Sequence, residues 1–349
     1  MGKAVSDETL VDAFEQVETA RGDISLTYFE FTTLAGFLIL KKENLDCAVL
    51  EVGLGGRLDT VNLVDADCVV ITPIGLDHQD YLGPDIASIA REKAGVIRKH
   101  IPVICTQNDP PETLLQIARQ QQARLYIRDR DFSIDKPLMK AESRLMFTLR
   151  DKALQISKPA MAGDHQQDNL AAALTALLVM NPTCAGQADQ LSAAIETCTV
   201  TGRLQKVGAS PTILLDVGHN ELAAQAIAEH LRNTGCTNVR CVVSMLRDKS
   251  AETVATELDS VCSHWYCGTS PGQRGQSGED LALKIRSGAP SANIRHFNSV
   301  GRSIKAALMD STADETILIF GSFTTVSAAY QWLRNHIKQE EHDAAKLTG

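Results

Sequence analysis

Short apolar runs alternate with stretches of helical periodicity along most of the chain. The N-terminal part shows two helical stretches, at 9–19 and 31–42, followed by strand-length apolar runs at 47–51, 68–72 and 102–105. Apolar runs of this length, separated by amphipathic helical patterns, are typical of buried strands in a mostly parallel sheet. The pattern therefore predicts an α/β protein.

The same alternation restarts after a connector at 201–211, which lacks helical periodicity. Before the connector, residues 125–160 show the apolar–polar alternation of a half-solvated sheet, and 169–180 is an Ala/Leu-rich helical stretch. After it, strands are expected at 212–216, 239–244, 264–268 and 316–320, with helices between and after them. This repetition predicts a doubly wound, Rossmann-like C-terminal domain. We place the domain boundary near residue 205, which gives domains 1–205 and 206–349.

Composition and charge narrow the function classes. Hydrophobic residues make up 44% of the 349 residues, and the formal net charge is −9, which argues against a general nucleic-acid binder. No apolar run is long enough for a membrane span, and the N-terminus has no apolar stretch typical of a secretory signal. The nine cysteines are scattered without a C-x-x-C pair. We expect them to be reduced, buried core residues of a cytoplasmic protein.

A glycine-rich turn follows the first predicted strand. The segment Glu51-Val-Gly-Leu-Gly-Gly-Arg-Leu-Asp59 suggests the dinucleotide fingerprint G-x-G-x-x-G, but Leu58 stands where the third glycine is due. Nicotinamide binding is therefore disfavoured. Glu51 lies at the carboxyl end of the predicted strand, where open α/β sheets bind ligands, or it is an ordinary exposed strand-end glutamate.

Further polar residues follow predicted strands or begin predicted helices. His78 follows the run at 68–72, and together with Glu51 it makes a plausible Mg²⁺ site, although histidine is an unusual ligand for so hard an ion. Lys93 lies in the helical segment 91–95, whose spacing by itself favours an ordinary solvated charged turn. Asn169, beside the helix cap Asp168, is placed to contact a purine edge. A serine-hydrolase elbow and the zinc patterns H-E-x-x-H and C-x-x-C are absent from the sequence.

Taken in order, these segments resemble a known family. The motifs E-V-G-L-G-G-R-L-D, L-D-H, R-E-K-A-G, H-Q-x-x-N, G-R and D-x-x-H-N are similar in order and spacing to those of the folylpolyglutamate synthase/dihydrofolate synthase family of the Mur-ligase superfamily. The resemblance covers about residues 20–335 and is nearest to the bacterial bifunctional form. It implies a Mur-ligase central ATPase domain followed by a Rossmann-like C-terminal ligase domain.

The resemblance also implies roles for individual residues. Glu51 and His78 would hold Mg²⁺, and Lys93, carbamylated by CO₂, would ligate a second Mg²⁺. Asn169, Arg203 and Asp216 would contact ATP, and His219 with Asn220 would lie near the incoming glutamate. The pterin pocket would be lined by Thr27, Tyr28, Phe29, Glu30, Leu58, Asp59 and Thr60.

The implied activity is ATP-dependent ligation of L-glutamate to 7,8-dihydropteroate, to folates or to both, through an acyl phosphate. Two alternatives stay open: another Mur-type amino-acid ligase, and a non-catalytic pseudoenzyme that binds folate or nucleotide. We expect a cytoplasmic monomer with small-molecule substrates and without nucleic-acid or membrane partners.

One departure from the family pattern matters for activity. The sequence contains neither G-x-x-x-x-G-K-[ST] nor T-N-G-K-G-[ST], the glycine-rich loops that cradle phosphates at the start of a helix. We therefore expect an N-terminally truncated central domain with an open sheet edge. A chain of these 349 residues is expected not to turn over ATP.

Overall fold

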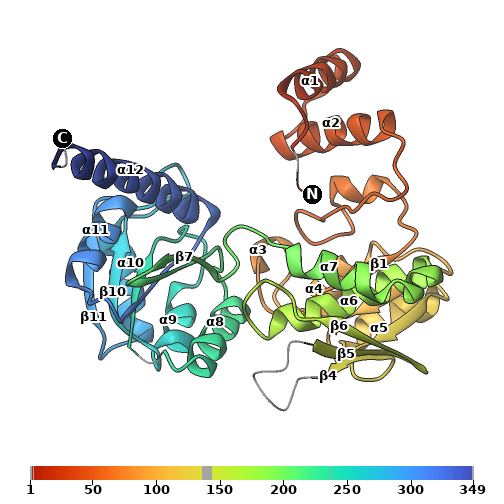
Figure 1. The fold of residues 1–349 in the computed structure, drawn as a ribbon. Helices are drawn as coiled ribbons and strands as arrows, with labels where there is room; N and C mark the ends of the chain where they lie inside the picture. The colour runs from red at the N-terminus through yellow and green to blue at the C-terminus, as the bar shows by residue number, and fades with distance from the viewer. Residues whose placement is uncertain (1, 3, 136–143, 237, 348–349) are drawn as a thin grey trace. The chain divides into compact units, whose positions relative to one another are not determined.

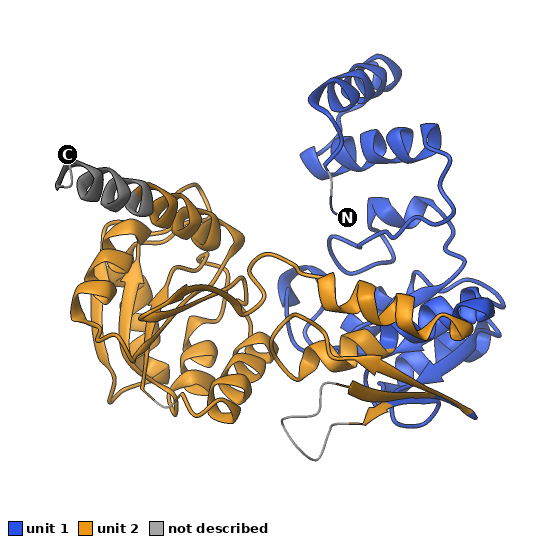
Figure 2. Cartoon of the chain, viewed as in Figure 1, with its two compact units in different colours: residues 1–133, 149–151, 172–184 blue, residues 134–148, 152–171, 185–349 orange. Residues whose placement is uncertain are grey.

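The computed structural model describes residues 2, 4–135, 144–236 and 238–347. The chain divides into two compact units, coloured separately in Figure 2. Unit 1 comprises Met1–Ser133, Leu149–Asp151 and Ala172–Cys184, and unit 2 comprises Ile134–Thr148, Lys152–Ala171 and Ala185–Gly349. No helix within the described ranges is long and apolar enough to cross a membrane.

Unit 1 begins with two helices that pack against each other, α1 (Asp7–Arg21) and α2 (Tyr28–Lys42) (Figure 1). Ser6 caps α1 by accepting a hydrogen bond from the backbone N–H of Thr9. Thr27 and Glu30 form a reciprocal capping box, so α2 begins three residues before the predicted 31–42. Both predicted helices are confirmed. Their shared core consists of Ala13, Val17, Ala35 and Ile39.

The sheet of unit 1 is parallel and three-stranded, in the order β1 (Val69–Ile71), β2 (Pro102–Cys105), β3 (Arg124–Ile127). The remaining short elements of this region are η1 (Thr60–Leu63), α3 (Gln79–Leu82), α4 (Ile86–Ala94) and α5 (Glu112–Gln120). Apolar side chains of α4 and α5 pack with those of β1 and β2 into one core. The predicted strands at 68–72 and 102–105 are therefore confirmed.

The strand predicted at 47–51 is wrong. Residues 47–51 form no strand, and the Val49 side chain is 95% exposed. A strand is held by hydrogen bonds to a neighbouring backbone, and 47–51 has no such neighbour among the described residues. β1 is correspondingly an edge strand paired with β2 alone in the described sheet, and Val70 is 44% exposed. The expected open sheet edge is thus present.

A second small sheet contains β4 (Phe132–Asp135), β5 (Arg144–Leu149) and β6 (Lys152–Ser157). Exposed and buried side chains alternate along most of β5, as the sequence pattern predicted for a half-solvated sheet. Residues 136–143 of that predicted stretch lie outside the described residues. Three helical elements follow, α6 (His165–Met180), η2 (Pro182–Gly186) and α7 (Ala188–Thr197). The predicted helix at 169–180 is therefore present and starts earlier.

Unit 2 contains a six-stranded sheet in the order β11-β10-β9-β12-β8-β7. Five strands are parallel, and β7 runs antiparallel to β8 at the edge. The strands are β7 (Gln205–Ala209), β8 (Thr212–Asp216), β9 (Val239–Val243), β10 (Cys262–Gly268), β11 (Asn293–Phe297) and β12 (Thr316–Phe320). The sequence pattern missed β7 and β11, because these edge strands carry polar residues.

Helices cover both faces of this sheet (Figure 1). One face packs against α8 (Glu221–Asn233), α9 (Ala251–Leu258) and α10 (Gly278–Gly288). The other packs against α11 (Val300–Asp310) and α12 (Phe323–Leu347). The predicted doubly wound domain is confirmed. Because the helices leave β9 and β12 toward opposite faces, the carboxyl ends of these adjacent strands form the topological switch point of the sheet.

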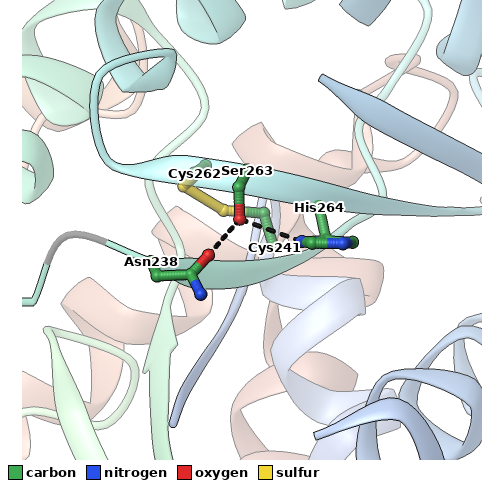
Figure 3. The surroundings of a disulfide bond; sticks show 5 residues. All are labelled: Asn238, Cys241, Cys262, Ser263 and His264. Atoms are coloured by element: carbon green, nitrogen blue, oxygen red, sulfur yellow. Dashed lines mark hydrogen bonds between the residues drawn. A yellow bond between two sulfur atoms is a disulfide. The ribbon is translucent and has the colours of Figure 1, made fainter. Parts of the chain in front are cut away.

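The expectation of uniformly reduced, buried cysteines is wrong in two respects. Cys241 and Cys262 form a disulfide between β9 and β10, with their Cα atoms 6.1 Å apart (Figure 3). Cys47 and Cys198 are exposed. Neighbouring parallel strands bring two side chains on the same sheet face within disulfide reach, although they are 21 positions apart in the sequence. Spacing along the chain therefore gave no sign of the pair.

Candidate functional site

The glycine-rich turn (residues 53–56) packs tightly against three helices of unit 1. A Cβ on Gly53 would lie 2.4 Å from the Phe29 ring of α2, and one on Gly55 would lie 2.7 Å from the Leu82 side chain of α3. A Cβ on Gly56 would lie 2.8 Å from the Glu92 carbonyl oxygen of α4. Gly55 also adopts φ +70°, which favours glycine. The glycines thus serve close packing of the turn.

Polar contacts hold the turn in place. The two carboxylate oxygens of Asp59 accept hydrogen bonds from the backbone N–H groups of Leu54 and Val61, at 2.9 and 2.8 Å. Arg57 donates twice to one carboxylate oxygen of Glu92, at 3.0 Å each, and its backbone N–H donates to the Glu92 carbonyl. The turn is therefore fixed both to η1 and to α4.

The predicted pterin-binding residues fall into three groups around this turn. Thr27 and Glu30 are engaged in the capping box, where the Glu30 carboxylate accepts from the Thr27 N–H at 2.7 Å and this bond lowers the pKa of Glu30. Tyr28, Phe29 and Leu58 expose apolar surface, with Tyr28 86% and Leu58 79% exposed. Two further predicted residues shape the following turn, Asp59 as the cap of η1 and Thr60 as its first residue.

Two of the three predicted metal ligands lie around Asp77. His78 adopts φ 54°, its backbone N–H donates to Asp77 Oδ1 at 2.8 Å, and its Nε2 lies 3.8 Å from the same oxygen. Burial lowers the pKa of Lys93 on α4, and the negative charge of Asp77 opposes that shift. Asp77 was given no role by the sequence reasoning, although it stands within the quoted L-D-H motif.

The third predicted ligand, Glu51, lies on the exposed segment without a strand. Within the described ranges, no group of three or more His, Cys, Asp or Glu side chains is placed to hold a metal ion. The joining of Glu51 to His78 and Lys93 stays a prediction.

In unit 2, Asp216 ties the connector to the end of β8. Its buried carboxylate accepts hydrogen bonds from the backbone N–H groups of Leu204, at 2.8 Å, and Gly218, at 2.6 Å. Burial raises the pKa of Asp216, whereas these two bonds and the charge of nearby Arg203 lower it. The predicted nucleotide-binding residues Arg203 and Asp216 are thus neighbours.

Asn169, the third predicted nucleotide-binding residue, belongs to a polar group at the start of α6. Its Nδ2 donates to Gln166 Oε1 at 3.2 Å, and Gln166 Nε2 lies 3.0 Å from His165 Nε2. Burial lowers the pKa of His165, and the negative charge of Asp216 opposes this shift. The negative charge of Asp216 therefore acts on the His165 ring.

His219 and Asn220 follow β8 directly. His219 Nδ1 lies 2.9 Å from the Val217 carbonyl oxygen, which only accepts, so Nδ1 carries the proton and Nε2 is left as an acceptor. The Asn220 side chain caps α8 by accepting from the Ala223 N–H at 3.0 Å. Asn220 is therefore a structural cap as well as a candidate ligand contact.

Buried polar atoms gather near the carboxyl ends of β9 and β10, and the sequence reasoning missed them. Ser244 Oγ, Ser270 Oγ and Gln276 Oε1 are buried without a hydrogen-bond partner in the described part of the chain. Thr325 Oγ1 donates to the Ser244 carbonyl at 2.6 Å, which joins the segments following β9 and β12. Unsatisfied buried polar atoms at a switch point suit a polar ligand. Their signal in the sequence was weak, because isolated Ser and Gln residues after strands are common.

Comparisons with known proteins agree with this arrangement. Residues 6–177 match the family model described as the Mur ligase middle domain. Residues 202–323 match the model described as the Mur ligase, glutamate ligase domain. The second match begins at residue 202, within the connector that the sequence pattern placed at 201–211.

Two relatives show which members of the Mur ligases this chain is similar to. The dihydrofolate synthase/folylpolyglutamate synthase of Escherichia coli (strain K12) is 36% identical over 329 residues, which cover 93% of this chain and 74% of the relative. The folylpolyglutamate synthase of Lacticaseibacillus casei is 29% identical and matches 92% of this chain and 74% of its own length.

Solved structures show the same relationship. The structure of E. coli FolC in complex with DHPP and ADP matches 96% of this chain and 78% of its own, at 34% identity and a TM-score of 0.87. A bifunctional folylpolyglutamate synthase/dihydrofolate synthase with Mn, AMPPNP and L-glutamate bound matches 95% and 78%, with a TM-score of 0.84. The chain therefore belongs to the dihydrofolate synthase/folylpolyglutamate synthase family of the Mur ligases.

Proposed function

We propose that the protein serves ATP-dependent ligation of L-glutamate to 7,8-dihydropteroate and to folates. The observation that carries this proposal is the position of the glycine-rich turn in unit 1. The turn contacts the Phe29 ring on one side and the α4 backbone at Glu92 and Lys93 on the other. It thus links the apolar surface suited to a pterin with the lysine expected at the phosphates.

The reaction has two steps. A carboxylate oxygen of the folate substrate attacks the γ-phosphorus of ATP, and the bond to ADP breaks, which leaves an acyl phosphate. The amine of L-glutamate then attacks the acyl carbon, phosphate leaves, and the amine gives up a proton. His219 is suited to take that proton, since its Nε2 is an acceptor.

We assign divalent-cation binding to the surroundings of Lys93. The pKa of Lys93 is lowered by burial, which favours the neutral amine that attacks CO₂ and loses a proton to form an anionic carbamate. Glu51 and His78 would hold one Mg²⁺ and this carbamate would ligate a second, and the Asp77 carboxylate beside His78 adds an oxygen donor suited to a hard cation. Bound Mg²⁺ would neutralise phosphate charge.

The remaining substrates are assigned to unit 2. Asn169, Arg203 and Asp216 contact the nucleotide, and His219 with Asn220 faces the incoming glutamate. The unsatisfied polar atoms of Ser244, Ser270 and Gln276 suit the carboxylates and amine of that amino acid.

We further propose that the boundary between the two domains lies near residue 205. We also propose that the protein is a monomer in the cytoplasm, where ATP and folates are available. The net charge of −9 argues against nucleic acid as a partner. Sedimentation at several protein concentrations tests the monomer, and limited proteolysis tests the boundary.

A second candidate function is a pseudoenzyme that binds folate or nucleotide without turnover. Saturable binding of dihydropteroate or nucleotide without glutamate-dependent phosphate release would identify it.

Ligand binding tests the substrate class. Isothermal titration of the chain with dihydropteroate should show saturable binding that Phe29→Ala weakens about tenfold, because an aromatic contact is lost. Phe37→Ala, a partly buried residue of the same helix outside the predicted pocket, is the matched control. Binding of a UDP-sugar cell-wall precursor instead of dihydropteroate would favour a different Mur-type ligase.

A further inference from the structure

One half-buried side chain of η1, Asn62, joins the glycine-rich turn to the end of α4. Its Nδ2 donates to the Arg57 carbonyl oxygen at 3.1 Å and to the Gly95 carbonyl oxygen at 3.3 Å. Arg57 directly follows the turn, and Gly95 is the residue at which α4 ends. A single amide nitrogen therefore connects two segments that lie far apart in the sequence.

Arg98 fixes the orientation of this amide. Arg98 Nη2 donates to Asn62 Oδ1 at 2.8 Å and to the Asn62 carbonyl oxygen at 3.1 Å, and Arg98 Nη1 donates to the Gly95 carbonyl oxygen at 3.2 Å. A guanidinium only donates, so the amide oxygen must face Arg98 and the amide nitrogen must face the two carbonyl groups. Arg98 is held in turn by an ion pair with Asp65. The amide of Asn62 is thus engaged within the protein, which indicates a role in positioning.

Backbone contacts complete the joint between the turn and α4. The backbone N–H of Arg57 donates to the Glu92 carbonyl oxygen at 2.8 Å. A Cβ on Gly95 would lie 2.3 Å from the Cβ of Arg57, so the close approach needs a glycine at this position. A Cβ on Gly56 would lie 3.2 Å from the Lys93 carbonyl oxygen. The joint therefore includes the backbone of Lys93 itself.

The side chains of Arg57 and Glu92 add an ion pair to this joint, with Arg57 Nη2 3.0 Å from Glu92 Oε1. The Arg57 side chain is 49% exposed, and ion pairs open to solvent contribute little to stability. The bonds made by the Asn62 amide are instead half-buried and join backbone to backbone. We therefore expect Asn62 to matter more for the joint than the ion pair does.

We propose that Asn62 is a positioning residue, which makes the glycine-rich turn and the end of α4 open and close as one unit. This inference rests on the proposed function, which puts the pterin at the turn and Lys93 at the phosphates. The carboxylate of the substrate must reach the phosphates while its pterin stays on the turn. A loose joint would let these two parts of the site move apart, whereas a firm one keeps the reacting groups in position.

Hydrogen exchange of the full chain, followed at single backbone amides, tests this inference. The Leu54 amide, bonded to the Asp59 carboxylate, reports on the turn, and the Gly95 amide, bonded to the Glu92 carbonyl, reports on the end of α4. Without ligand, the two amides should exchange with the same opening free energy. Dihydropteroate at about nine times its Kd should slow both about tenfold, because a ligand suppresses every opening of the unit that it binds.

Substitutions at Asn62 should separate the two amides. Asn62→Leu removes both donations to the carbonyl groups, so dihydropteroate should still slow exchange at Leu54 and leave Gly95 unchanged. Asn62→Asp should do the same while keeping an oxygen acceptor for the guanidinium, which makes it the variant less prone to unfold. Arg57→Ala, the matched control, deletes only the exposed ion pair and should keep the joint slowing of both amides.

The outcomes distinguish this inference from the proposed function. Joint slowing that survives in both Asn62 variants would overturn the inference, as would slowing at Leu54 alone in the unsubstituted chain, although the pterin site would then stand. Exchange that also speeds up throughout α1 in both variants would show a general loss of stability and contradict a local role. Absence of dihydropteroate binding would contradict the proposed function and, with it, the role given to Asn62.

Discussion

The two parallel sheets of the molecule differ in how completely their strands are enclosed. In unit 2, β12 lies between β8 and β9, has helices on both faces, and is buried at each of its five positions. In unit 1, β1 has three residues and is an edge strand of the described sheet. The comparison teaches that an apolar run becomes a strand only where a neighbouring backbone is available.

The largest expected effect tests this contrast in packing. Phe320→Ala, in the core of unit 2, should lower the free energy of unfolding by about 3–5 kcal/mol, because it leaves a cavity beside Trp265. Val49→Ala should change it by less than about 0.5 kcal/mol, because that side chain is exposed. Urea unfolding followed by tryptophan fluorescence measures the first effect, and far-UV circular dichroism follows both. Similar losses for the two variants would contradict the contrast.

The next effect concerns the disulfide, which crosslinks only the sheet of unit 2. Reduction of Cys241–Cys262 should lower the unfolding free energy of that unit by about 3 kcal/mol, since a loop of some 21 residues is opened. Denaturant unfolding with and without a thiol reductant measures the loss. Cys47→Ser, which removes an exposed thiol of unit 1, should leave the reductant effect unchanged. Alkylation of all nine cysteines in the unreduced, unfolded chain would show that the bond is absent.

In unit 1, the glycine-rich turn is stabilised by hydrogen bonds from two backbone N–H groups to the Asp59 carboxylate. Asp59→Ala removes the acceptor of two backbone N–H groups and should cost about 1–2 kcal/mol of stability, with weaker dihydropteroate binding. Asp59→Asn keeps one acceptor oxygen and should lose less. Thermal melts and titration with dihydropteroate measure both variants. Equal behaviour of the two would show that the carboxylate does not organise the turn.

The smallest expected effect is a pH dependence of unit 2. Burial lowers the pKa of both His165 and His230 below their ordinary 6.5. As the pH falls through about 6.5, the unfolded chain therefore binds protons that the folded chain does not, and stability decreases. The raised pKa of Asp216 acts in the opposite direction, since the folded state gains that proton first.

Melting temperatures between about pH 8 and about pH 5.5 measure this dependence. His230→Gln removes one of these two histidines and should flatten the decrease. A melting temperature that rises on acidification would contradict the assignment.

The sequence pattern correctly predicted strands that have a partner strand on each side. It failed for the run at 47–51, which has no partner strand in the described chain, and for the polar edge strand β11. The runs at 212–216 and 316–320 become β8 and β12, because each finds partners on both sides. The equally apolar run at 47–51 does not become a strand. The edge strand β11 was missed because Asn293 and Arg295 mask its apolar positions.

The candidate site was predictable to a similar degree. Motif order named Lys93, Asn169 and Asp216, and the structure gives each a polar environment that a ligand site would use. Asp77 beside His78, and the unsatisfied atoms of Ser244 and Gln276, became visible only once the chain was folded. Folding brings the Asp77 charge near Lys93, which lies on a later helix, and isolated Ser and Gln residues are too common to signal a site.

Glutamate-dependent phosphate release tests the central claim most directly. The measurement uses ATP, Mg²⁺ and dihydropteroate, with and without L-glutamate, on the 349-residue chain and on a version that carries a relative's Gly-Lys-Ser phosphate loop. We predict release only from the version with the loop, and only when both dihydropteroate and L-glutamate are present. Release from the 349-residue chain would contradict the need for that loop. Silence from both would contradict the ligase and favour the pseudoenzyme.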